Sequence, residues 1–153
     1  MCFISHSTVV RRDYKYELTD VRKNYIALLE NVFNCKMDRK RDEFHYNFVT
    51  QTNIQYEMLP GEVEVTFTPL LTGCYLKVDL YVRHLASYKR EAWINKTLEY
   101  LEARLKKEGT EVTVKLTTIK CPKCKHEFEV NSRMDMCICP RCKTRLNIKH
   151  KEL

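Results

Sequence analysis

The stretch SYKREAWINKTLEYLEARLKKEG, residues 87–109, decides how the first part of the chain folds. Its less polar side chains recur every three or four residues, which is the spacing of one face of a helix. The resulting stripe consists of Trp93, Ile94, Thr97, Leu98, Tyr100, Leu101 and Leu105. Ser87 is a suitable N-cap and Gly109 a suitable C′ residue, so the pattern predicts a helix over 88–108. Such a stripe must cover another apolar layer.

The residues before this helix supply that layer as strands with one wet face. Apolar and polar residues alternate in 8–16, 44–48, 54–58, 63–67 and 76–82, with turn signals at Pro60-Gly61 and between Pro69 and Gly73. Helical spacing predicts a second amphipathic helix over 20–34, with Thr19 or Asp20 as its N-cap. The charged run 37–43 reads as a solvated turn. We therefore expect an α+β domain over 1–110, an antiparallel sheet with a long covering C-terminal helix.

The order strand, helix, four antiparallel strands and long helix resembles the helix-grip layout of START-like ligand-binding domains over residues 7–108. That resemblance implies a curved sheet that wraps the last helix and encloses an apolar cavity. The chain has fewer strands than that family and lacks its usual second small helix. A two-layer α/β sandwich without a cavity is therefore the alternative, and a cavity lined by the sheet and the last helix would distinguish the two.

Two CPxC motifs follow, at residues 121–124 and 139–142. A C-x-x-C turn brings two thiolates close together, and two such turns at the ends of a hairpin complete a tetrahedral S₄ shell. Nothing in the sequence marks secretion and no apolar run could span a membrane, so we expect a cytoplasmic location, where clustered cysteines bind metal rather than form disulfides. The predicted cofactor is one Zn²⁺, held by Cys121, Cys124, Cys139 and Cys142.

These paired motifs resemble the zinc-ribbon family over about residues 119–148. The resemblance implies a second domain over 111–153, with ribbon strands at 127–130 and 145–148. In such knuckles a glycine usually follows the second cysteine, because the backbone there prefers positive φ. Lys125 and Lys143 take those places here, at a cost of about 1 kcal/mol each.

The remaining cysteines and the neighbouring histidines are less suitable as metal ligands. Cys137 could compete with Cys139, but its use would break the second CPxC motif. The cysteines without partner spacing, expected to be small buried residues, are Cys2, Cys35 and Cys74. His126 and His150 flank the motifs, but four thiolates already fill the shell.

The excess positive charge lies in this tail. Residues 115–153 carry ten Lys and Arg against four acids, a net charge of +6, whereas residues 1–114 have a net charge of +1. The cations around the knuckles are Lys120, Lys123, Lys125, Arg141, Lys143 and Arg145. Such a surface predicts phosphate contacts with DNA or RNA. Phe128 offers a stacking face for a base unless it belongs to the ribbon core. Two alternatives stay open: an adaptor that docks an acidic protein surface, and a binder of an apolar ligand within 7–108.

No feature of the sequence predicts catalysis. A Cys₄ shell leaves no open position for an activated water. The chain has three glycines and contains no G-x-S-x-G, P-loop or HExxH motif. His45 with Asp38, Asp42 and Glu43 could be imagined in a metal-dependent hydrolase, but a charged, solvated turn explains the same residues. We therefore expect a non-enzymatic protein.

Overall fold

The structure, a computed structural model, describes residues 6–113, 116–131 and 136–147. By internal contacts the chain divides into two compact units, residues 1–112 and 113–153, each of which is described by itself. Among the described helices, none combines the length and the apolar character needed to cross a bilayer.

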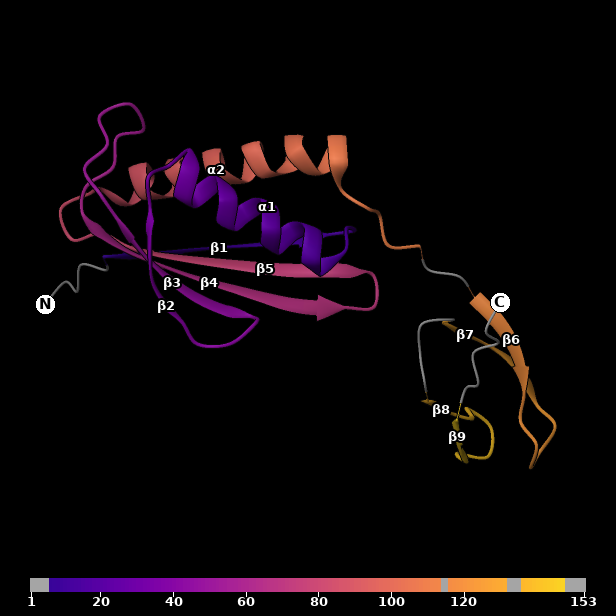
Figure 1. Cartoon of the computed structure of the whole chain (residues 1–153). Coiled ribbons are helices and arrows are strands. Elements are labelled where there is room, and N and C mark those ends of the chain that lie inside the picture. The colour runs from indigo at the N-terminus through magenta and orange to yellow at the C-terminus, as the bar shows by residue number, and fades with distance from the viewer. Residues whose placement is uncertain (1–5, 114–115, 132–135, 148–153) are drawn as a thin grey trace, which may run out of the picture. The chain divides into compact units, whose positions relative to one another are not determined.

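The first unit is a five-stranded antiparallel sheet with two helices (Figure 1). Its elements are β1 (Ser7–Tyr14), α1 (Leu18–Asn31), β2 (Lys36–Lys40), β3 (His45–Thr50), β4 (Gly61–Leu70), β5 (Gly73–Tyr81) and α2 (Ser87–Glu108). The strand order is β1-β5-β4-β3-β2, so the first strand pairs with the last. Both helices lie on the same side of the sheet in Figure 1 and pack against each other. The predicted α+β class is confirmed.

Strand alternation and the α2 stripe together build the core. On β4 and β5 the inward side chains are buried while their neighbours in the sequence are more exposed, as expected for a sheet with one covered face. The α2 residues Ile94, Leu98, Leu101 and Leu105 are at most 2% exposed. The largest fully buried side chains include Tyr25, Phe33, Phe48, Phe67, Leu76, Leu80 and Ile94.

The helix-grip resemblance predicted an apolar cavity between the sheet and the last helix. Aromatic rings occupy the space between the sheet and the helices: Tyr25 and Phe67 meet edge to face with centroids 6.5 Å apart, and Phe33 meets Trp93 at 5.5 Å. These ring contacts are the kind of packing expected of the two-layer sandwich, the alternative that the sequence left open. The apolar-ligand alternative stays a prediction.

Both helices begin without the side-chain caps that the sequence suggested. Helix α1 follows Glu17 and helix α2 follows Ala86, and neither N-cap residue makes a capping hydrogen bond with its side chain. Asp20 instead accepts a hydrogen bond from the backbone N–H of Thr110 at 2.8 Å, which fastens α1 to the end of α2. Gly109 has φ −74°, so it is not the left-handed C′ residue that was predicted.

The predicted strand over 54–58 is wrong, and a strand that was not predicted replaces it. Residues 54–57 form a turn closed by a bridge between Asn53 and Met58. Residues 36–40, which overlap the charged run 37–43 that was predicted to be a solvated turn, form β2, an edge strand paired with β3. Charged side chains suit that position, because an edge strand with Lys and Arg resists pairing with other chains.

The described part of the second unit consists of two hairpins. Strand β6 (Leu116–Lys120) pairs with β7 (Glu127–Asn131), and β8 (Met136–Ile138) pairs with β9 (Arg145–Asn147). Strands β7 and β9 lie where the zinc-ribbon resemblance placed strands, although position 148 is outside the described residues.

Candidate metal centre

The two CPxC segments fold into turns with the same hydrogen bonds. The backbone N–H of Cys121 donates to the carbonyl of His126 at 2.9 Å, and the N–H of Lys125 donates back to the Cys121 carbonyl at 2.8 Å. The second turn repeats the pattern: Cys139 donates to Thr144 at 2.9 Å, and Lys143 donates to Cys139 at 2.9 Å. Each knuckle is therefore a closed loop at the end of its hairpin, which aims two thiols in one direction.

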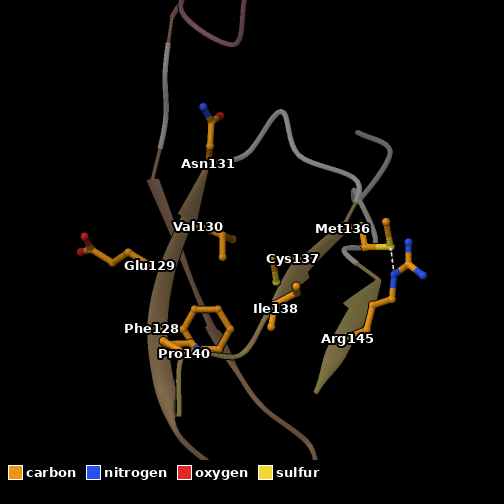
Figure 2. Close-up of a pocket in the computed structure, with 9 residues that line it drawn as sticks. All are labelled: Phe128, Glu129, Val130, Asn131, Met136, Cys137, Ile138, Pro140 and Arg145. Atoms are coloured by element: carbon orange, nitrogen blue, oxygen red, sulfur yellow. Dashed lines mark hydrogen bonds between the residues drawn. The ribbon is translucent and has the colours of Figure 1, made fainter. Parts of the chain in front are cut away.

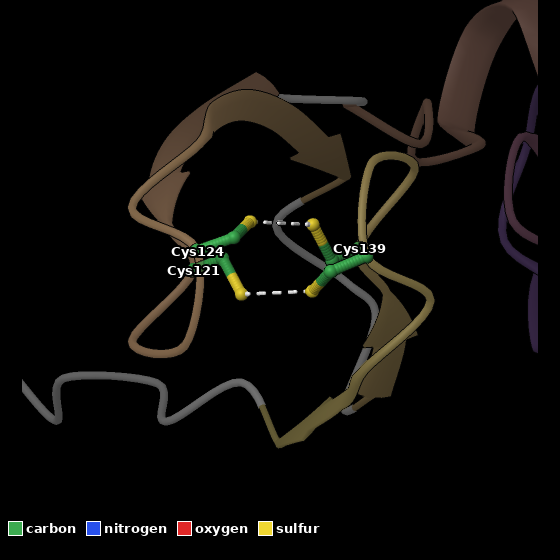
Figure 3. A group of neighbouring side chains, drawn as sticks. Cys121, Cys124 and Cys139 are labelled. Carbon is green, nitrogen blue, oxygen red and sulfur yellow. Dashed lines mark hydrogen bonds between the residues drawn. The ribbon is translucent and has the colours of Figure 1, made fainter.

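The two knuckles bring four sulfurs into one cluster (Figure 3). The Sγ atoms of Cys121 and Cys142 are 3.6 Å apart, as are those of Cys124 and Cys139. All four sulfurs lie within 4.8 Å of one another. A tetrahedral shell with Zn–S bonds near 2.3 Å would place its sulfurs about 3.8 Å apart. The residues present thus fit a zinc ion, and all of them are free thiols rather than disulfides.

Local hydrogen bonds prepare two of these thiols, Cys139 and Cys142, to ionise. At Cys124 the backbone N–H of His126 favours the thiolate, but burial and hydrogen bonds with the other three cysteines raise the pKa to about 11. The Thr144 hydroxyl, 3.0 Å from the Cys142 sulfur, and then the Thr144 backbone N–H lower the pKa of Cys142 to about 6. Burial opposes ionisation of Cys139, but the N–H groups of Cys142 and Arg141 outweigh it and lower the Cys139 pKa. Because the thiolate is the metal ligand, these donors favour binding of a divalent cation.

The lysines that replace the expected glycines have the backbone conformation that glycine favours. Lys125 and Lys143 both have φ 62°, in the left-handed region. The strain predicted at these two positions is therefore present in the structure.

Replacing Lys125 or Lys143 with glycine should increase the affinity of the four-cysteine site for zinc. Relief of about 1–2 kcal/mol of left-handed strain exceeds the ~0.5–1 kcal/mol entropic cost of a new glycine, so each change should stabilise the zinc form by a fraction of a kcal/mol. Competition with a chromogenic chelator measures the effect. Lys123→Gly, at a position without positive φ, is the matched control and should weaken zinc retention slightly; the same loss at all three positions would contradict this account.

Within the described residues, no other cysteine or histidine side chain joins the four-sulfur group. Cys137 is buried on β8 and lines a groove instead of joining the four ligands. Cys35 and Cys74 are buried, as predicted. The His126 ring stacks on Phe128, with centroids 6.0 Å apart and planes 15° from parallel. Cys2 and His150 are outside the described residues.

The six cations predicted to bind nucleic acid are all exposed. Lys120 lies directly opposite Glu127 in the β6–β7 register, so a neighbouring carboxylate offsets part of its charge. The Arg145 Nε donates to the Met136 sulfur at 2.8 Å, which holds that side chain over the β8–β9 hairpin. The described part of the ribbon contains these six cations and only two acids, Glu127 and Glu129.

Sequence reasoning missed a groove of ≈ 810 Å³ between the two hairpins (Figure 2). Its walls are mostly apolar and are formed by Phe128, Glu129, Val130, Asn131, Met136, Cys137, Ile138, Pro140 and Arg145. Phe128, Val130 and Cys137 point into it, whereas Glu129 points away from them. The alternation of Phe128 and Val130 with acids was a signal for an apolar face, but only the fold shows which strand it meets.

The hydrolase alternative around His45 receives no support. The ring Nδ1 of His45 lies 2.8 Å from a carboxylate oxygen of Asp42, and Asp42 also accepts the backbone N–H groups of Phe44 and His45. This is a self-contained surface turn. Within the described residues, the four-cysteine group is the one cluster of potential metal ligands.

The chain matches no protein-family model, and no curated protein is similar enough to count as a relative. Among solved structures, the chain is similar to the crystal structure of protein MLL2253 from Mesorhizobium loti, with a TM-score of 0.47 and 16% sequence identity. The match covers 66% of this chain and 97% of that chain. A likeness of this degree has no bearing on function.

Proposed function

We propose that this protein is a non-enzymatic nucleic-acid-binding protein whose zinc-held ribbon contacts the phosphate backbone. The observation that carries the proposal is the exposure of all six cations around the two knuckles, against two acids in the described part of the same unit. Lysine and arginine on a small rigid module bind phosphates by releasing condensed counterions, with no need for base-specific contacts. The zinc fixes the loops that hold four of these cations, Lys123, Lys125, Arg141 and Lys143.

Knuckle geometry indicates which cations matter most. Lys123 and Arg141 occupy the x-positions inside the two CPxC turns, and both are exposed while the flanking thiols converge on the cluster. Lys120 should contribute less, because Glu127 lies opposite it. Three to five phosphate contacts are within reach of such a set, which predicts weak binding near physiological salt and little base preference.

The test is a salt series with nuclease-treated, zinc-loaded protein and a labelled oligonucleotide. Log K should fall with log salt by about 0.9 per phosphate contact on duplex DNA, or about 0.7 on a single strand. Lys123→Ala combined with Arg141→Ala should reduce both affinity and slope while zinc stays bound. Lys106→Ala combined with Lys107→Ala, two exposed cations at the end of α2, is the matched control and should change neither.

Two results would reject the proposal. One is equal binding by the wild type and the Lys123/Arg141 double variant. The other is no binding by the wild type even at about 50 mM salt, where phosphate contacts are strongest. An adaptor that docks an acidic protein surface would then be the better account of the same charges.

A further inference from the structure

The ribbon carries an aromatic ring pair and an apolar groove beside its cations. His126 and Phe128 are two residues apart on one side of the chain, with their rings nearly parallel and 6.0 Å between centroids. The Phe128 ring is half-buried and forms one end of the groove between the hairpins, beside Pro140 (Figure 2). This arrangement offers flat π-faces at the mouth of an apolar groove.

One cation lines the groove, and a second follows one of its lining residues in the sequence. Arg145 lines its β9 wall, and Pro140 belongs to the second knuckle, directly before Arg141. On β7 the acids Glu127 and Glu129 alternate with Phe128 and Val130, and in Figure 2 Glu129 points away from the groove. Strand alternation thus turns the Glu129 side chain away from Phe128 and Val130, although Glu129 still belongs to the groove's lining together with one cation, Arg145.

From these two features we propose that the ribbon binds single-stranded nucleic acid, with an unstacked base placed against the His126–Phe128 ring pair and the apolar groove. This inference rests on the proposed function and deepens it. Base–aromatic stacking tolerates any base, because every base has a π-face. The cations hold the phosphates on either side of that base, and a duplex, whose bases are already stacked and paired, gains only the phosphate contacts.

The first knuckle positions the ring pair through its backbone hydrogen bonds. The carbonyl of His126 accepts the N–H of Cys121 at 2.9 Å, and the His126 N–H donates to the Cys124 sulfur. The backbone that carries the His126 ring is therefore part of the first knuckle. Phe128 follows two residues later on β7, opposite Ile119 in the β6 register.

The test compares full-length, zinc-loaded protein binding to a labelled oligo-dT strand of about 12 nucleotides and to a duplex of the same length, by fluorescence anisotropy at one low salt concentration. The strand should bind more tightly than the duplex. Phe128→Leu, which keeps apolar volume but removes the flat ring, should weaken strand binding roughly tenfold and leave duplex binding unchanged. Phe128→Trp should keep strand affinity. Thr118→Ala, on the neighbouring strand opposite Glu129, is the control and should change nothing.

Zinc content separates a folding defect from a binding defect. If Phe128→Leu loses zinc, His126→Ala tests the same ring pair, because the knuckle uses only the backbone of His126. The inference would be overturned if strand and duplex bound equally and if Phe128→Leu and His126→Ala both bound like the wild type. The proposed function would still stand in that case if the Lys123/Arg141 double variant lost affinity. Binding of neither probe would overturn both.

Discussion

Chelation of zinc is expected to unfold residues 116–131 and 136–147 and to leave the sheet and helices of the first unit folded. The described ribbon buries only four side chains below a tenth of their surface, Cys121, Val130, Cys137 and Cys139. Two of these four are ligands, so the unit has almost no core of its own. In such modules the binding free energy of zinc, about 10–16 kcal/mol, is the folding free energy.

Heteronuclear NMR provides the readout for this prediction. Backbone amide peaks of 116–131 and 136–147 should collapse to random-coil positions after chelation and return when one equivalent of zinc is added. Peaks of the β4–β5 hairpin, whose inward side chains are fully buried, serve as the internal control and should not move. A ribbon that keeps dispersed peaks without zinc would contradict the metal-held fold.

The second large effect should come from Leu98→Asp. Leu98 is 2% exposed on the inner face of α2, between the helix and the sheet. An unpaired carboxylate buried there costs several kcal/mol, a large part of the 5–15 kcal/mol that stabilises an ordinary domain. We expect the variant to be largely unfolded, or to melt far below the wild type, in a thermal scan followed by circular dichroism.

Ala103→Asp is the matched control for that variant. It introduces the same carboxylate into the same helix at an exposed position, so it should lose only the helix-propensity difference of about 0.7 kcal/mol or less. If both variants melt within a degree or two of the wild type, α2 is not the cover of the sheet.

The sequence was most informative where one long periodic signal dominated. The seven-residue stripe of 87–109 predicted α2 to within one residue, because 22 helical residues leave little room for another period. Short alternation misled at 54–58, where Ile54 and Tyr56 have strand spacing but Ile54 is 91% exposed in a turn. The other four alternating runs fall on β1, β3, β4 and β5. At β2 a strand was mistaken for a turn, because the residues of an edge strand can be as polar as those of a loop.

At the candidate site the sequence predicted the ligands and not the surroundings. Paired CPxC spacing is a local constraint, and the structure brings together the same four sulfurs. The strain at Lys125 and Lys143 was also readable, because knuckle geometry fixes φ locally. The groove depends on how β7 meets β8, and the stacking of His126 on Phe128 depends on side-chain rotamers, so neither could be read from spacing.

Zinc content per chain tests the central claim most directly. Protein purified without added metal, and without chelators, should contain one zinc per chain by metal analysis. Cys137→Ser, which alters the leftover cysteine in the groove, should retain that zinc, whereas Cys139→Ser should lose most of it. Well under one zinc in the wild type, or loss of zinc from Cys137→Ser with retention in Cys139→Ser, would contradict the four-cysteine centre on which the ribbon and its proposed binding surface depend.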